Sequence, residues 1–496
     1  MRLFVGYIIL CLSCCFNSKS QDSIKFTKKF ETHQNNIPLN IIRSKDCFFV
    51  LRYNKDLHDF TIEKRAEGDG HQIHFTFLKL DDVCSHLFDY ENLDYFLLEK
   101  ENKLFFIFEK ITNSQKTIYQ KIIDSTGYAG KFTTLCTLEW DKNIQDVNFL
   151  MKPTVDNKLL IIASIIYLNG IVKKSAVLFD LINETPVWIK KLPNENFGIR
   201  SGCFVTDEHN DLWHICTKFI EIKDTSAGEI YVRDLLLLYH IPADAIEATG
   251  VILKVPKDLS PHDAVILPYK NGIIFFSNLY KTVKENNSEL INGYFYAEYI
   301  VNDTSIYSKL IPYDEATTKK LTFYDGNDYN DPGYKPFSFT DNFIDGRNLI
   351  VILERKQYDF FKDILTVKFD MDAGKIKWMH VLPRKIFFFP SRTQYKSIGC
   401  YSASYLNNTL NIYFLDHPSN LKKNIATTSY SKSEKLMILN DGVISKIKIA
   451  DNGISKSLFF SRPDYRLISL KNNPVKKESR LMFYFNYGSW EKFGVE

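Results

Sequence analysis

The sequence predicts an all-β protein with the β-propeller fold, and three observations lead to this prediction. Short apolar strands that follow a polar turn residue recur along the 496 residues. Two stretches that lie 190 residues apart share one motif. No helical periodicity separates the strand signals. We expect four-stranded antiparallel blades that close into a ring, because one blade alone cannot bury both of its faces.

The clearest unit is the stretch from Arg347 to Pro383, RNLIVILERKQYDFFKDILTVKFDMDAGKIKWMHVLP. Its apolar run from Leu349 to Leu353 is typical of a strand that is covered on both faces. Apolar and polar residues then alternate from Leu365 to Asp370, and a turn at Asp372 to Gly374 precedes a third strand with Trp378. The stretch therefore predicts an antiparallel meander.

The meander is repeated elsewhere in the chain. FDLINETPVWIKKLP, from Phe179 to Pro193, aligns without a gap with FDMDAGKIKWMHVLP, from Phe369 to Pro383, and the Phe, Asp, Trp, Leu and Pro coincide. Similar apolar strands follow one another at gaps of 57, 55, 53, 61, 76, 61 and 71 residues. They begin at Cys47, Leu104, Leu159, Leu212, Ile273, Leu349, Leu410 and Leu481.

This period favours eight blades. Seven blades are the alternative, because the strand at Cys47 or the strand at Leu481 could belong to a shared blade. Few residues follow Leu481, so we expect an N-terminal strand from Ile24 to Phe30 to complete the last blade and close the ring. The alternative is that this segment is a frayed arm.

The first 20 residues have the layout of a secretory signal peptide, with Arg2, an apolar run from Leu3 to Leu12 and a small, polar end before Gln21. A lipid anchor on Cys14 or Cys15 is the alternative. We expect residues 21–496 to form a single propeller domain that is secreted or periplasmic. No later segment is long enough for a transmembrane helix.

Charge and cysteine content exclude some classes of function. Removal of residues 1–20 leaves 61 basic and 59 acidic residues, so nucleic acid is not an expected partner. The remaining cysteines form no C-x-x-C motif and have no zinc-ligand spacing. Cys203 and Cys216 flank a turn and are a candidate disulfide. The alternative is that both are small buried residues.

A segment from Phe323 to Phe339, FYDGNDYNDPGYKPFSF, departs from the repeat. Its mixture of tyrosines and carboxylates predicts a recognition loop, because loops on a rigid scaffold often bind ligands. Two alternatives are a calcium site at Asp325, Asn327 and Asp331 and ordinary turn chemistry. The candidate ligand-binding residues are Tyr324, Asp325, Asp328, Tyr329, Asp331 and Tyr334.

The second departure is the segment from Arg384 to Lys396, RKIFFFPSRTQYK. Its basic and aromatic residues suit stacking on a sugar or contact with an anionic ligand, and Arg384, Arg392 and Tyr395 are the candidates. The alternative is that Phe387 to Phe389 is the innermost strand of the next blade, or packs beneath the loop.

No catalytic residue and no cofactor other than the calcium alternative is predicted. The sequence has no G-x-S-x-G motif, no P-loop and no Rossmann glycine motif. Asp416-His417-Pro418 follows an apolar strand and is expected to be a turn. Propeller glycosidases use carboxylates from different blades, and a sequence alone does not reveal such pairs.

Two resemblances accompany these patterns. The turn Asp370-Met371-Asp372-Ala373-Gly374 that leads to Trp378 resembles the blades of quinoprotein-type propellers. That resemblance implies the fold and not the redox activity, because residues 21–496 contain no vicinal cysteine pair. From about Asp363 to the C-terminus, the chain resembles uncharacterised secreted propeller proteins of Bacteroidetes-type bacteria, which implies no activity.

We therefore expect a non-catalytic binding or scaffold protein of the cell envelope, with a protein or a glycan as its partner. The alternative is a secreted hydrolase or lyase that acts on glycans with carboxylates from several blades. An enzyme of this kind requires carboxylates close together, at least one of them with a perturbed pKa. A redox quinoprotein is the third hypothesis.

Overall fold

A computed structural model describes the parts of the chain that form the strands and many of their turns. The described residues are 24–26, 30–31, 36–43, 47–54, 59–66, 72–78, 95–100, 103–111, 114–124, 126–140, 143–154, 158–168, 172–192, 203–224, 229–245, 248–255, 259–283, 288–300, 306–313, 337–357, 360–384, 386–387, 401–422, 443–460, 465–469, 481–485 and 489–495.

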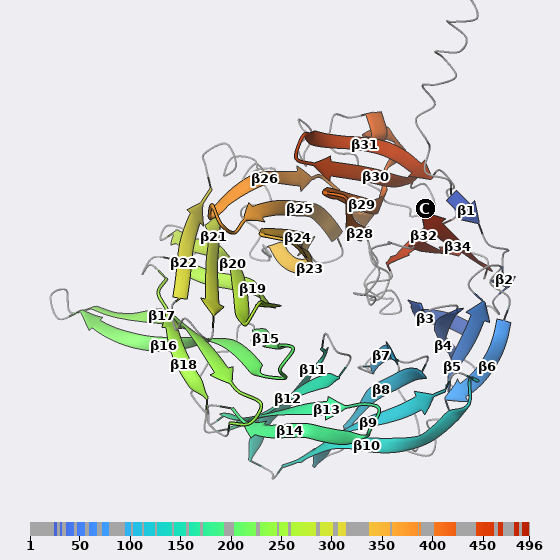
Figure 1. The fold of residues 1–496 in the computed structure, drawn as a ribbon, viewed down its shortest axis with the longest axis horizontal. Helices are drawn as coiled ribbons and strands as arrows, with labels where there is room; N and C mark the ends of the chain where they lie inside the picture. The colour runs from blue at the N-terminus through green and yellow to red at the C-terminus, as the bar shows by residue number, and fades with distance from the viewer. Residues whose placement is uncertain are drawn as a thin grey trace, which may run out of the picture.

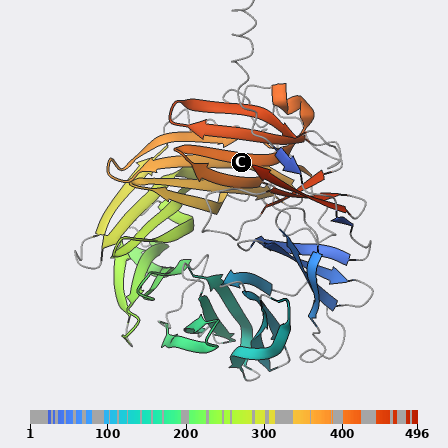
Figure 2. The ribbon, with the colours of Figure 1, turned by 45° about the vertical axis from the view of Figure 1, so that its right-hand side comes forward.

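The protein is a β-propeller, as predicted, and its sheets surround a common axis (Figures 1 and 2). Seven blades are each built from four consecutive antiparallel strands. They are blade 1, β3 (Asn36–Arg43), β4 (Cys47–Asn54), β5 (Asp59–Ala66) and β6 (Gln72–Leu78); blade 2, β7 (Tyr95–Lys100), β8 (Lys103–Ile111), β9 (Gln115–Ile123) and β10 (Ala129–Glu139); blade 3, β11 (Ile144–Pro153), β12 (Leu159–Tyr167), β13 (Val172–Asp180) and β14 (Thr185–Lys191); blade 4, β15 (Cys203–Thr206), β16 (Leu212–Asp224), β17 (Glu229–Ile241) and β18 (Thr249–Leu253); blade 5, β19 (Leu259–Tyr269), β20 (Gly272–Val283), β21 (Ser288–Ile300) and β22 (Ile306–Pro312); blade 6, β23 (Phe337–Asp345), β24 (Asn348–Gln357), β25 (Phe360–Asp370) and β26 (Lys375–Leu382); and blade 7, β28 (Tyr401–Leu406), β29 (Thr409–Asp416), β30 (Val443–Ala450) and β31 (Gly453–Phe460).

An additional sheet joins the two ends of the chain. β32 (Tyr465–Ser469), β33 (Leu481–Phe485) and β34 (Ser489–Val495) pair in sequence, and β1 (Ile24–Phe26) and β2 (Phe30–Glu31) both pair with β34. In the register, Ile24 lies opposite Val495. This pairing confirms ring closure by an N-terminal strand.

The structure supports seven blades of consecutive strands, which was the alternative count, and does not by itself support the preferred count of eight. The eighth apolar strand at Leu481 belongs to the sheet that joins the chain ends. The spacing of apolar strands in the sequence counts strands and not complete blades. The two counts differ because the strand at Leu481 lies outside the seven blades of consecutive strands.

Apolar residues lie between the blades because each inner sheet is covered on both faces. On β24, Leu349, Val351 and Leu353 pack with residues of blade 5, whereas Ile350 and Ile352 pack with residues of blade 7. All five are fully buried. A strand buried on both faces has no reason to alternate apolar and polar residues, which explains the unbroken run in the sequence.

The 190-residue repeat has a structural basis at the turn that joins the third and fourth strands of a blade. Asp180 accepts hydrogen bonds from the backbone amides of Ile182 and Asn183, at 2.9 and 3.2 Å. Asp370 accepts equivalent bonds from Asp372 and Ala373, at 3.1 and 2.9 Å. The repeated aspartate therefore fixes the turn.

The candidate disulfide between Cys203 and Cys216 stays a prediction, because the side chain of Cys203 lies outside the described residues. Cys203 lies opposite Ile215 in the register of β15 and β16. Successive side chains of a strand point to opposite faces, so Cys216 lies on the other face from Ile215. Cys216 is buried.

We predict that Glu184→Gly stabilises the protein by about 0.5–1 kcal/mol. Glu184 has a φ of 53°, and the equivalent residue of blade 6 is Gly374, with a φ of 56°. A left-handed conformation costs a residue with a side chain roughly 1–2 kcal/mol, which the larger entropy loss of glycine only partly offsets. Denaturant unfolding measures the difference.

The matched control is Glu184→Ala, which removes the 3.2 Å hydrogen bond from Thr133 but keeps the left-handed strain. It should be neutral or slightly destabilising. Equal effects of the alanine and glycine variants would contradict the argument from backbone strain.

Candidate functional site

Most of the predicted ligand-binding residues lie outside the described residues, so their roles stay predictions. Of the two segments that depart from the repeat, the structure describes residues 337–339, 384 and 386–387. The residues outside the described part are Tyr324, Asp325, Asn327, Asp328, Tyr329, Asp331, Tyr334, Arg392 and Tyr395.

Arg384 is described, and its side chain is not on the surface as predicted. It is fully buried, and its Nη2 lies 2.6 Å from Oε1 of Glu354, which is 2% exposed. Its backbone amide also donates to Oδ1 of the buried Asp363, at 3.4 Å. A guanidinium buried with a carboxylate holds the chain in place, so direct contact between Arg384 and a ligand is corrected to a structural role.

The two predicted segments meet blade 6 at the same end. Arg355, the neighbour of Glu354 on β24, lies opposite Phe337, the first residue of β23. Its guanidinium lies 6.0 Å from the centroid of the Phe337 ring. Asn278 of blade 5 donates to the carbonyl oxygen of Phe337 at 3.0 Å. The end of the first segment and the start of the second therefore both lie against buried charged residues at this end of blade 6. We call these residues the shared base of the two segments.

The start of the second segment adds a short strand to blade 6. β27 (Ile386–Phe387) pairs with β25, with Phe387 opposite Phe360. The alternative that made Phe387 part of the innermost strand of the next blade is therefore wrong. In the described part of blade 7, the first strand in the sheet order is β28.

Two tyrosine–aspartate pairs connect the first strands of blades 6 and 7. The hydroxyl of Tyr401 donates to Asp341, and the hydroxyl of Tyr405 lies 3.1 Å from Oδ2 of Asp345. Burial and the bond to Asp345 raise the pKa of Tyr405 above its ordinary value. Both phenols therefore stay neutral donors at neutral pH.

The spacing of these two aspartates does not fit a glycosidase. They are four residues apart on one strand, which corresponds to about 13 Å. Paired carboxyl groups of glycosidases lie roughly 5–10 Å apart. Asp341 and Asp345 thus connect neighbouring blades and do not form an acid–base pair with each other.

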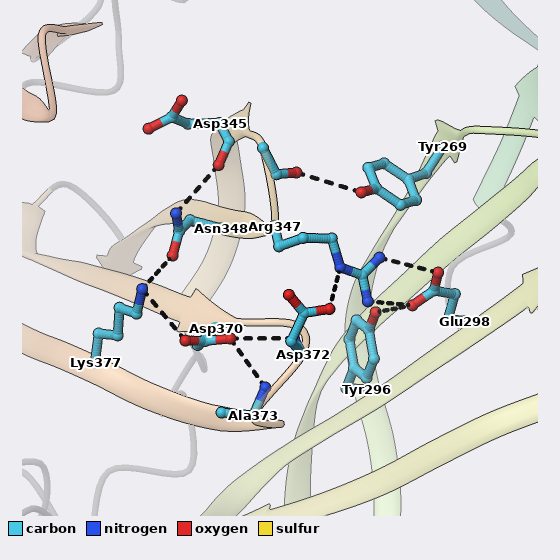
Figure 3. A network of polar contacts seen from close by, with 11 residues as sticks. Tyr269, Tyr296, Glu298, Asp345, Arg347, Asn348, Asp370, Asp372, Ala373 and Lys377 are labelled. Carbon is cyan, nitrogen blue, oxygen red and sulfur yellow. Dashed lines mark hydrogen bonds and ion pairs between the residues drawn. The ribbon is translucent and has the colours of Figure 1, made fainter.

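A polar network lies between blades 5 and 6, and we call it the Arg347 cluster (Figure 3). Arg347, in the turn between β23 and β24, donates to both carboxylate oxygens of Glu298, on β21, at 3.1 and 3.2 Å. Its Nε donates to Asp372 at 2.6 Å. The cluster consists of Tyr269, Tyr296, Glu298, Arg347 and Asp372.

Two tyrosines complete the Arg347 cluster. The hydroxyl of Tyr296 donates to Oε2 of Glu298 at 2.8 Å. The hydroxyl of Tyr269 donates to the carbonyl oxygen of Gly346 at 3.3 Å, and its ring centroid lies 5.4 Å from Cζ of Arg347. Every polar group of the guanidinium edge that faces Glu298 is therefore engaged within the protein (Figure 3).

The electrostatics of the Arg347 cluster indicate permanent ion pairs. Burial acts to raise the pKa of Glu298, but hydrogen bonds from Arg347 and Tyr296 outweigh it and lower this pKa below the ordinary value. The bond to Glu298 raises the pKa of Arg347. A carboxylate with a lowered pKa is a poor proton donor at neutral pH, so the cluster is suited to joining blades and not to acid–base chemistry.

Similar contacts from one blade to a turn of the next recur around the ring. The indole of Trp188 donates to the carbonyl oxygen of Asn210 at 2.9 Å, and the indole of the equivalent Trp378 donates to Asp451 at 3.1 Å. Lys309 donates to the carbonyl oxygen of Ala373 at 3.1 Å. The repeated tryptophan of the sequence therefore marks inter-blade turn contacts, which the sequence alone did not reveal.

The expected turn at Asp416-His417-Pro418 is confirmed. Oδ1 of Asp416 accepts from the backbone amide of His417 and from the side chain of Asn420, both at 2.8 Å. These bonds precede and support a short 3-10 helix, η3 (Pro418–Lys422). Lys456 also lies 2.5 Å from Oδ2 of Asp416, which makes this aspartate a structural residue.

Among the ranges given above, no group of three or more His, Cys, Asp or Glu side chains is arranged to hold a metal ion. Within the same ranges, no helix is both long and apolar enough to cross a membrane. The calcium alternative at Asp325, Asn327 and Asp331 lies outside these ranges and stays untested.

No protein-family model matches the chain, and no curated protein matches it. Among solved structures, it is similar to the propeller domain of the trilobed protease from Pyrococcus furiosus, at 10% identity and a TM-score of 0.36, over 86% of this chain and 99% of that chain. It is also similar to Porphyromonas gingivalis dipeptidyl peptidase 4, at 8% identity and a TM-score of 0.42, over 92% of this chain and 59% of that chain.

A third similar structure is a polysaccharide lyase, at 10% identity and a TM-score of 0.32, over 68% of this chain and 87% of that chain. Likenesses at this level concern the fold and say nothing of activity. The resemblance to secreted Bacteroidetes-type proteins and to quinoprotein blades therefore stays a prediction.

We predict that Arg347→Met destabilises the protein by about 3 kcal/mol, because it leaves Glu298, whose side chain is 9% exposed, without its main counter-ion. Asp372 is 68% exposed, so the control Asp372→Asn should cost about 1 kcal/mol or less. Chemical denaturation of both variants measures the difference. Equal losses in the two variants would show that the buried ion pair adds nothing beyond a surface contact.

Proposed function

We propose that the protein is a non-catalytic binding or scaffold protein of the cell envelope, secreted or periplasmic, with a glycan or a protein as its ligand. The ligand is held by the segments at 323–339 and 384–396. The observation that carries this proposal is the shared base of the two segments, in which Glu354 pairs with the buried Arg384 and Arg355 lies opposite Phe337.

A rigid base of this kind suits a binding site. Glu354, Arg355, Asp363 and Arg384 are all 2% exposed or less. The buried Arg384–Glu354 ion pair fixes the start of the second segment, and the hydrogen bond from Asn278 to Phe337 fixes the end of the first. Fixed ends reduce the entropy that a loop loses when a ligand binds. The tyrosines and basic residues farther along the segments would then supply the contact surface, as the sequence predicts.

The four carboxyl groups with lowered pKa values in the described part of the chain have structural roles. The carboxyl groups of Asp124, Glu298, Asp370 and Asp451 all have lowered pKa values. The Thr126 hydroxyl is the main cause at Asp124, and the Lys368 ammonium is the main cause at Asp451. Lowered values are typical of carboxylates that bind a cation or cap a turn, whereas a general acid requires a raised value.

The alternative function is a hydrolase or lyase acting on glycans. Glycosidases place two carboxyl groups on either side of the scissile bond. Asp341 and Asp345 are the described carboxylates on the first strand of blade 6, and each is already bonded to a tyrosine. One experiment that measures both glycan binding and the release of shortened glycans tests both functions.

We predict that the triple variant Tyr324→Ala, Tyr329→Ala, Tyr334→Ala of residues 21–496 loses at least about tenfold in affinity for its glycan. Loss of a single stacked aromatic ring is worth roughly 1 kcal/mol, and 1.4 kcal/mol corresponds to a factor of ten. A glycan array identifies the bound class, and calorimetry with that glycan, with and without calcium, gives the affinity.

The matched control is Tyr128→Ala, because Tyr128 is 71% exposed in a turn of blade 2 and should leave affinity unchanged. Unchanged binding by the triple variant would overturn the assignment of the segment. Release of shortened glycans by the wild-type protein would overturn the non-catalytic role and favour the alternative. If the array is blank, capture of envelope proteins by the wild type but not by the triple variant would identify a protein ligand.

A further inference from the structure

Blade 4 carries a two-stranded arm that extends beyond the ring. Its second and third strands, β16 and β17, have 13 residues each, whereas the corresponding strands of blade 3, β12 and β13, have nine each. The ends of β16 and β17 project outward from the other blades (Figure 1). We call residues 218–224 of β16 and 229–235 of β17 the blade 4 arm.

In the described part of the chain, no further strand pairs with either edge of the blade 4 arm. β15 pairs with β16 only from Leu212 to Ile215, and β18 pairs with β17 only from Leu236 to His240. The two strands of the arm pair with each other through seven consecutive residues without a bulge. A two-stranded ribbon is marginally stable on its own, and a regular open edge readily accepts another strand. The arm is therefore suited to pairing with a strand from outside the ring.

The outer edge of the blade 4 arm, on β17, has a self-complementary sequence. Residues 229–233 read Glu-Ile-Tyr-Val-Arg, with an acid at one end and a base at the other. When two such strands pair antiparallel about Tyr231, Glu229 of each copy lies opposite Arg233 of the other. Ile230 of each copy then lies opposite Val232. Residues opposite each other in an antiparallel pair share one face of the sheet, so each acid is matched with a base and each aliphatic residue with another.

This register of β17 with itself is specific, and it is compatible with the existing sheet. A shift by one residue toward β18 places Glu229 opposite Asp234, and a shift by one residue in the other direction places Glu229 opposite Val232. In the matched register the second strand ends opposite Arg233, before Leu236, where the pairing of β17 with β18 begins. The second strand therefore extends the open edge without displacing β18.

The inner edge of the blade 4 arm, on β16, lacks this complementarity. Pairing of two β16 strands about Ile222 places Glu221 opposite Lys223, but it also places Ile220 opposite Asp224. An aliphatic residue opposite a carboxylate gains neither apolar burial nor charge neutralisation. The charges therefore favour the outer edge.

The blade 4 arm contains one unfavourable pair that a second copy would compensate. Asp224 of β16 lies opposite Glu229 of β17, and like charges directly opposite each other destabilise a sheet. The base on the same face of β17 is Arg233, which is four residues farther along the strand, or about 13 Å away. Antiparallel pairing about Tyr231 places Arg233 of the second copy directly opposite Glu229. A second copy therefore supplies the counter-charge at this position.

We propose that the protein forms a two-fold symmetric dimer in which β17 of one copy pairs antiparallel with β17 of a second copy through residues 229–233. The two arms then form one four-stranded sheet between the rings, and the interface is self-complementary, as two-fold symmetry requires. Five residues per strand make a small interface, so we expect a dissociation constant on the order of 10 µM. The arm belongs to blade 4 and the proposed ligand segments adjoin blade 6, so the dimer is independent of the proposed function.

Sedimentation velocity of residues 21–496 at low ionic strength, from about 1 to about 200 µM, tests the dimer. The wild type should change from monomer to dimer across this range. Glu229→Arg, and separately Arg233→Glu, places like charges opposite each other at both ends of the paired strands, so each variant should dimerise at least about tenfold more weakly. An equimolar mixture of the two variants restores opposite charges at both ends and should dimerise as the wild type does.

The matched control is Glu221→Arg, which makes the same change of charge in the blade 4 arm but on β16, and it should leave the dimer unchanged. The double variant Glu229→Arg, Arg233→Glu carries the reversed pair and should dimerise as the wild type does, which separates loss of the interface from loss of the fold. A wild type that stays monomeric throughout the range would overturn the proposal. So would dimerisation that neither single variant weakens, a mixture that dimerises no better than either variant alone, or equal weakening by Glu221→Arg.

Discussion

The structure depends on the burial of apolar surface between neighbouring blades. A blade of this protein has two apolar faces, as the opposite packing of Leu349 and Ile350 on β24 shows. Neither face can be covered within the blade, so each blade is stable only between two others. Ring closure through β1 and β34 is therefore a requirement of the whole fold, because an open ring would expose apolar faces to water.

Polar contacts complement this burial at the turns. Trp188, Lys309 and Trp378 each donate to a turn of the following blade, and Arg347 connects two blades through Glu298. These hydrogen bonds and ion pairs are directional, whereas apolar packing is largely non-directional. They fix the rotation of one blade against the next.

Two interfaces between blades have different residues at equivalent positions. Ile364, Ile412 and Phe414 satisfy the fold between blades 6 and 7, whereas Lys174, His214 and Cys216 occupy the equivalent positions between blades 3 and 4. Packing alone would favour the apolar set, since buried polar groups cost free energy. The fold therefore accepts either set of residues at this interface.

The sequence by itself determined the strand period, the antiparallel meander, the closing strand and the aspartate turns, because all of these follow from local alternation and turn chemistry. Only the tertiary structure decided the rest. Arg384 resembles a surface residue until Glu354, 30 positions earlier, is seen beside it. Arg347 and Glu298 are 49 positions apart and on different blades. Such pairings depend on how sheets stack, and stacking is set by the packing of whole faces, which no local pattern of residues records.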